Sequence, residues 1–138
     1  MAKIWELATG RSIREIPIRD HEAVNPAFST DGSRLLLTDR RGGVVLDLRS
    51  GREICTLIGS GGSAFSPDGR RVVSAYGDAV SIWDAEDGRE LLGLKGHNNV
   101  VRGNLFSPDG REIYTIDESK TLRIWLSAPP EEVRLAEQ

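Results

Sequence analysis

The sequence is poor in the residues that build metal clusters and disulfides. Its 138 residues include one cysteine, Cys55, and two histidines, His21 and His97. A single cysteine cannot form an intramolecular disulfide, and one cysteine with two histidines excludes a zinc cluster of the usual spacing. We expect Cys55 to be a packing or edge residue, because a reactive thiol needs a cationic setting that Ile54 and Thr56 do not supply.

Long apolar runs and an excess of positive charge are also missing. No run is long enough to span a bilayer. The formal net charge of −3 gives no electrostatic reason to expect binding to nucleic acid or to an anionic membrane. The N-terminus has no basic segment followed by an apolar stretch, so no secretory signal is expected. These absences favour a cytoplasmic protein that binds neither nucleic acid nor membrane.

What the chain does contain is a short pattern that occurs four times. An Ile-Trp pair or its equivalent leads into turn residues that, in the first three copies, end in Gly-Arg. The copies occupy residues 4–11, 45–54, 82–91 and, in a weaker form, 124–133. A second marker, Phe-Ser-x-Asp-Gly, lies between them at residues 28–32, 65–69 and 106–110. The period of about forty residues is typical of stacked repeats, whose apolar faces are buried only by neighbouring repeats.

The repeats predict short strands and tight turns. Asp-Gly between apolar runs indicates a hairpin, because glycine takes the positive φ that the turn demands. Nothing shows a sustained helical period. The expected strands cover residues 2–7, 13–18, 33–38, 43–46, 53–58, 71–75, 79–83, 90–94, 112–116, 121–125 and 132–136, together with the strands that contain Phe28, Phe65 and Phe106. We therefore expect an all-β chain of four-stranded antiparallel sheets, with strands a to d in each repeat, stacked around an axis as the blades of a propeller.

Three motifs resemble those of a known family. Gly96-His97, the marker at residues 106–110 and Ile82-Trp83-Asp84 resemble the WD-repeat β-propeller family, and the resemblance covers nearly the whole chain. It implies four-stranded blades around a central channel, and it implies partner binding rather than catalysis.

The repeat count predicts an incomplete ring within a single propeller segment. We expect a half blade of strands c and d at 1–18, blades at 19–58 and 59–95, and a blade with a degenerate last strand at 96–138. About three and a half blades fall short of the four to eight of closed propellers. Both outer sheet faces should then be adhesive apolar patches. Two copies related by a two-fold axis would not complete the ring cleanly, because both would lack the same two strands. The expected partners are other proteins or further blades, with a homo-oligomer through the open faces as an alternative.

The resemblance also implies a buried hydrogen-bond network of a histidine, a strand-b hydroxyl, the strand-c tryptophan and an aspartate in the b–c turn. Leu46 replaces the tryptophan in one repeat, and Gly59-Ser60 replaces Gly-His in the next. The last repeat has His97 and Trp125, but its acid, within residues 117–119, is displaced. We therefore expect no complete network. The expected structural residues are Trp5, His21, Asp31, Gly32, Asp68, Gly69, Trp83, His97, Asp109, Gly110 and Trp125.

No nucleophile, base and orienting group converge in the sequence, so we expect no enzyme and no cofactor. The glycine-rich residues 59–63 lack the lysine and the helix of a phosphate loop. We expect an interaction scaffold that binds through its d–a and b–c loops, since arginine and tyrosine anchor interfaces. The candidate contact residues are Arg40, Arg41, Tyr76, Asn99, Arg102 and Lys120. Two alternatives are a sensor or anchoring fragment of a larger kinase-like or protease-like enzyme, and a purely structural segment that completes a ring.

Overall fold

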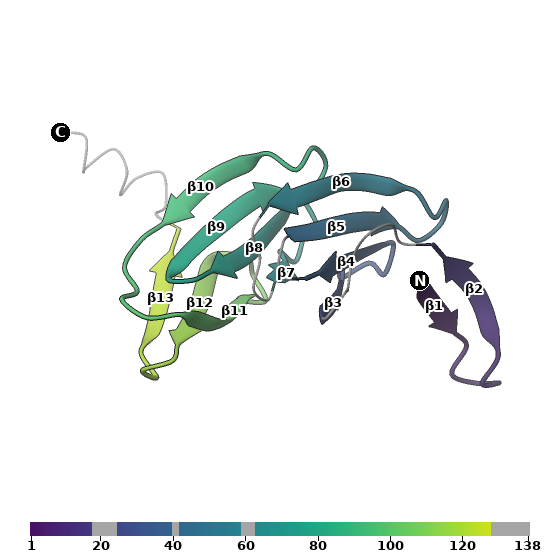
Figure 1. Ribbon diagram of the computed structural model, residues 1–138, viewed down its shortest axis with the longest axis horizontal. Helices are drawn as coiled ribbons and strands as arrows, with labels where there is room; N and C mark the ends of the chain where they lie inside the picture. Colours follow the sequence, from purple (N-terminus) through teal and green to yellow (C-terminus); the bar gives the residue numbers. More distant parts are fainter. Residues whose placement is uncertain (18–24, 40–41, 59–62, 128–138) are drawn as a thin grey trace.

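The computed structural model describes residues 1–17, 25–39, 42–58 and 63–127, and within them it contains thirteen strands and no helix (Figure 1). In chain order the strands are β1 (Ala2–Trp5), β2 (Ser12–Ile16), β3 (Asn25–Phe28), β4 (Arg34–Thr38), β5 (Gly42–Asp47), β6 (Glu53–Ile58), β7 (Ser63–Phe65), β8 (Arg71–Tyr76), β9 (Ala79–Asp84), β10 (Glu90–Leu94), β11 (Val101–Phe106), β12 (Glu112–Asp117) and β13 (Leu122–Leu126). The predicted strands agree with these bounds to within two residues, except that residues 132–136 lie outside the described residues.

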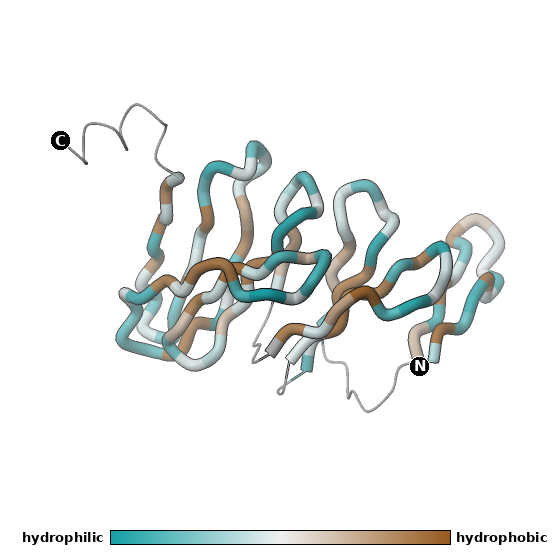
Figure 2. The backbone as a smooth tube through the Cα atoms, turned by 90° about the horizontal axis from the view of Figure 1, so that it is seen from above, coloured by the Kyte–Doolittle hydropathy of each residue, from teal (hydrophilic) through white to brown (hydrophobic). Residues whose placement is uncertain are grey.

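Four separate sheets form from consecutive antiparallel strands. Their orders are β1-β2, β3-β4-β5-β6, β7-β8-β9-β10 and β11-β12-β13. The sheets stand one behind another along an open arc (Figures 1 and 2). The predicted fold class, an all-β incomplete ring of propeller blades, is confirmed. The exact blade limits stay a prediction, because residues 18–24, 59–62 and 128–138 lie outside the described part of the chain.

The sheets hold together through apolar clusters between their faces. Side chains alternate between the two faces of a strand, so Leu35 and Leu37 face the first sheet while Leu36 faces the third. This explains why β4 and β5 read as continuous apolar runs: both of their faces are covered. The buried residues of the three clusters are Ile16, Leu35, Leu37, Val44 and Leu46; Leu36, Val45, Leu57, Phe65, Val72, Trp83 and Ala85; and Val73, Ala75, Val80, Ile82, Val101 and Ile113.

The turns between strands a and b repeat one geometry. In the second sheet the Asp31 carboxylate accepts hydrogen bonds from the Ser29 hydroxyl at 2.7 Å and the Ser33 amide at 2.9 Å. Gly32 follows with a φ of 72°. Equivalent serine–aspartate bonds and positive-φ glycines recur at residues 66–69 and 107–110. The hairpin therefore depends on a side-chain hydrogen bond as well as on glycine.

Exposure of the repeat aromatics follows the number of strands in the preceding sheet. Trp83 and Trp125 pack on that sheet, and Trp83 is 7% exposed. Trp5 is 55% exposed, because no described sheet precedes β1. Phe28 is 60% exposed whereas its equivalent Phe65 is 9% exposed, since the described part of the sheet before Phe28 consists of the two strands β1 and β2. The prediction that Trp5 packs inside a blade is not met in the described structure.

Gly88 offers a sharp test of the contact between the second and third sheets. A Cβ on Gly88 would lie 2.4 Å from the Thr56 carbonyl oxygen, and its φ is +74°. Gly10 has a similar φ of +68° but nothing within 4 Å. Both alanine substitutions incur a positive-φ cost of about 1–2 kcal/mol, but only Gly88→Ala also forces the sheets apart. We expect Gly88→Ala to destabilise the chain clearly more than Gly10→Ala in urea unfolding, and equal losses would contradict this contact.

Candidate functional site

Three loop segments meet at one edge of the last two sheets. We call residues 76–79, 95–102 and 117–121 the loop rim. The Val101 amide donates to the Gly77 carbonyl at 2.8 Å, and the Glu118 amide donates to the Val100 carbonyl at 2.9 Å. These bonds fix the β8–β9 turn, the β10–β11 loop and the β12–β13 turn relative to one another.

Four of the predicted contact residues lie on the loop rim. Tyr76, Asn99, Arg102 and Lys120 are all exposed. The Arg102 Nε donates to the Glu118 carboxylate at 2.9 Å, between two largely exposed side chains. Such a surface pair contributes little to stability, which leaves the guanidinium available to a partner. The other two predicted contact residues, Arg40 and Arg41, lie outside the described residues, as does His21.

A buried polar network lies beneath the loop rim. The two ring nitrogens of His97 bond to the Asp117 carboxylate at 2.9 Å and to the Thr115 hydroxyl at 2.6 Å. The Trp125 indole N–H donates to the same hydroxyl at 2.9 Å. The side chains of His97 and Asp117 are 0% and 3% exposed. A neutral imidazole with its proton on Nδ1 satisfies the carboxylate and accepts from the Thr115 hydroxyl at Nε2.

The prediction that no repeat carries the full network is therefore wrong for the last repeat. From its spacing in the sequence, Asp117 is expected to lie away from the position of the network's aspartate. In the structure β12 extends to Asp117, so the Asp117 carboxylate lies at the end of strand b and reaches His97. The other sheets carry less of the network within the described residues. Trp83 donates to Ser74 at 2.7 Å, while Leu46 occupies the tryptophan position of the second sheet.

Asp117 also shapes the loop rim itself. Its other carboxylate oxygen accepts from the Ser119 hydroxyl at 2.6 Å and from the amides of Ser119 and Thr121, each at 3.0 Å. The bonds from Ser119 and His97 lower the pKa of Asp117 to about 2. Within this turn Lys120 takes a φ of 66°, which is uncommon for a residue other than glycine. One ionised side chain thus links the core network to the exposed turn.

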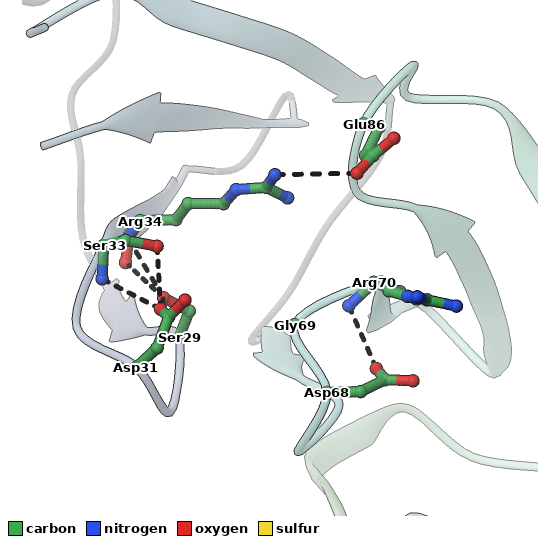
Figure 3. Close-up of a pocket in the computed structure, with 8 residues that line it drawn as sticks. All are labelled: Ser29, Asp31, Ser33, Arg34, Asp68, Gly69, Arg70 and Glu86. Carbon is green, nitrogen blue, oxygen red and sulfur yellow. Dashed lines mark hydrogen bonds and ion pairs between the residues drawn. The ribbon is translucent and has the colours of Figure 1, made fainter. Parts of the chain in front are cut away.

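A small cleft lies between the second and third sheets, at the edge opposite the loop rim (Figure 3). Its volume is about 170 Å³, and the Arg34 guanidinium lies 3.7 Å from the Glu86 carboxylate across it. Bonds from Ser33 and Ser29 lower the pKa of Asp31 to about 2. The lining residues are Ser29, Asp31, Ser33, Arg34, Asp68, Gly69, Arg70 and Glu86. Sequence reasoning assigned these aspartates to turns, and the cleft is smaller and more polar than ordinary ligand pockets.

Metal and membrane sites find no support in the described part of the chain. It holds no group of three or more histidine, cysteine, aspartate or glutamate side chains that could bind a metal ion. None of the described residues forms a helix long and apolar enough to cross a membrane.

Comparison with known proteins agrees with this geometry. The repeat family described as "WD domain, G-beta repeat" matches residues 88–125, from the β9–β10 turn to β13. Apoptotic protease-activating factor 1 of Rattus norvegicus is 27% identical over 89% of this chain and 11% of its own length. Nuclear distribution protein nudF of Aspergillus niger is 26% identical over 89% of this chain and 34% of its own length. Intraflagellar transport protein 122 homolog of Xenopus tropicalis is 34% identical over 46% of this chain and 5% of its own length.

Stacked four-stranded sheets on an open arc define a partial β-propeller. Residues 88–125 match the WD-repeat family, and the chain is similar to WD-repeat relatives over as much as 89% of its length. It spans about a third or less of the length of these three relatives.

Removing the Thr115 hydroxyl measures how much the buried network contributes to the stability of the chain. Thr115→Val keeps the shape of the side chain but leaves both the His97 and the Trp125 ring nitrogens without a partner. Each buried unsatisfied group costs about 1–3 kcal/mol, so for two groups we expect a loss of roughly 2–6 kcal/mol in the free energy of unfolding, measured with urea. Ser74→Ala is the matched control, because it leaves only the Trp83 indole without its partner. Equal losses for the two variants would contradict the larger network.

Asp117 predicts a defined pH dependence of stability. Its pKa is about 2 in the folded chain against an ordinary value of 3.8. Between these values the unfolded chain binds more protons, so the contribution of Asp117 is complete above about pH 4 and is lost as pH falls towards 2. We expect the difference in urea midpoint between the wild type and Asp117→Asn to narrow across this range. A difference that stays constant with pH would contradict the assignment.

Proposed function

We propose that the chain is a protein–protein interaction scaffold that binds partner proteins through the loop rim and carries no catalysis of its own. WD repeats generally mediate protein–protein interactions, which supports this class of function. We choose the loop rim as the binding surface because Asp117 has two roles there. Its carboxylate belongs to the buried network and also fixes the exposed turn that presents Lys120.

The chemistry of the loop rim suits protein recognition. Tyr76 and Arg102 supply the aromatic and guanidinium groups that dominate binding energy when desolvated. A rim held by backbone hydrogen bonds loses little conformational freedom on binding, which favours affinity. The expected cytoplasmic location stays a prediction.

A second candidate is a sensor or anchoring part of a larger multi-domain protein. The observation that favours it is the short share of each relative that this chain covers, 11% in the case of apoptotic protease-activating factor 1. An antibody raised against this chain would decide between the two in the native source. A band well above 15.1 kDa would favour the second candidate, and a band at that mass would count against it.

Rim substitutions test the binding surface. We expect the double variant Tyr76→Ala/Arg102→Ala to lose partner proteins that the immobilised wild-type chain retains from a source extract. The matched control is Leu7→Ala/Arg52→Ala, which removes an apolar and a guanidinium group from exposed c–d turns at the opposite edge. All four side chains are exposed, so unfolding midpoints should stay close to that of the wild type. Equal retention by both double variants would rule out the loop rim.

A further inference from the structure

The last sheet presents an apolar face that none of the described residues covers. Strand pairing places Tyr114 opposite Ile124, and Ile116 opposite Leu122, on the same side of the sheet. Leu122 and Ile124 are 57% and 53% exposed. We call this surface the C-terminal face, and its residues are Leu105, Tyr114, Ile116, Leu122, Ile124 and Leu126.

The preceding sheet shows what kind of surface covers such a face. Val80 and Ile82 occupy on β9 the positions that Leu122 and Ile124 occupy on β13. They are 0% and 7% exposed, because the β11–β13 sheet packs over them. Trp125 of that covering sheet packs against the cluster. The covering element is therefore a sheet of the same type that presents its strand-c tryptophan.

The first sheet presents that covering element, and none of the described residues lies beneath it. Residues 3–5 read Lys-Ile-Trp, and residues 123–125 read Arg-Ile-Trp. The N-terminal face, which we define as Lys3, Trp5 and Glu15, points away from the second sheet, while Ile4 packs towards it. Trp5 thus stands where Trp83 and Trp125 stand in later sheets, but it has no described surface beneath it.

Two strands are enough to cover the outer half of a sheet. The β1–β2 sheet packs through Ala2, Ile4 and Ile16 against Val44 and Leu46, both of which are fully buried. Phe28 is exposed in the described structure, yet the two strands of the first sheet still make this contact. A two-stranded sheet can therefore cover β13 and the adjacent part of β12 in the same way.

We propose that two copies of this chain associate head to tail, with the N-terminal face of one copy packed on the C-terminal face of the other and Trp5 against Leu122 and Ile124. This association goes beyond the proposed function, because it rests on the packing of stacked sheets and not on the loop rim. Such a contact is heterologous, so it yields a ring if the rotation closes and a filament if it does not. Two copies supply eight sheets, within the four to eight of closed propellers, with a gap beside each Phe28.

Sedimentation of the purified full chain over a wide concentration range tests the association. We expect the mass to rise from 15.1 kDa to twice that value. Trp5→Lys and Ile124→Lys each bury a charge in the contact, and each should weaken association at least about tenfold. Leu122→Lys is a second variant of the C-terminal face in case Ile124→Lys fails to fold. Tyr76→Lys is the control, because it adds the same charge on the loop rim and should associate as the wild type does.

Mixing the two single variants separates head-to-tail contact from other arrangements. Trp5→Lys keeps an intact C-terminal face, and Ile124→Lys keeps an intact N-terminal face, so their mixture should recover one contact and form a dimer. If two C-terminal faces met each other instead, Trp5→Lys would still dimerise and the mixture would recover nothing. That result, or a wild type that remains monomeric at every concentration, would overturn the proposal. The rim variant Tyr76→Ala/Arg102→Ala should still dimerise, so failure of the scaffold proposal would be seen separately.

Discussion

Contact between sheets through alternate side chains is the interaction on which the rest of this structure depends. A four-stranded sheet with two apolar faces is not stable by itself, and Leu36, Val45 and Val72 are fully buried only because neighbouring sheets meet them. Each sheet touches its sequence neighbours, so the chain behaves as a one-dimensional stack. The arc, the exposed aromatics of the first two sheets and the uncovered last face all follow from this single constraint.

Buried hydrogen bonds also stabilise the stacked sheets, and their number differs from sheet to sheet. The last sheet has the complete set from His97 to Trp125, whereas the described residues of the third repeat show the bond between Trp83 and Ser74 alone. A buried set that satisfies all of its members fixes one arrangement of the surrounding loops. The loop rim is therefore best defined where it borders the last sheet, and it is there that the proposed contact residues gather.

Much of the fold could be predicted from the sequence, because strand length and turn chemistry are local properties. The marker with Asp31-Gly32 forms its turn through bonds within six residues, and such turns fixed the strand limits closely. The network could not be predicted by spacing, since the reach of Asp117 to His97 depends on how far β12 extends. The exposure of Trp5 depends on a neighbouring sheet that no local pattern describes.

The three tryptophans occupy three different surroundings, and this gives the chain built-in optical reporters. Trp83 is buried beside a serine hydroxyl, Trp125 is half-buried beside a threonine hydroxyl, and Trp5 is open to water. Indole emission shifts to longer wavelength as the ring meets water, so each sheet that carries a tryptophan contributes a distinguishable part of the spectrum. Loosening of the third sheet would expose Trp83 and shift its emission to longer wavelength. Covering of the first sheet would bury Trp5 and shift its emission to shorter wavelength.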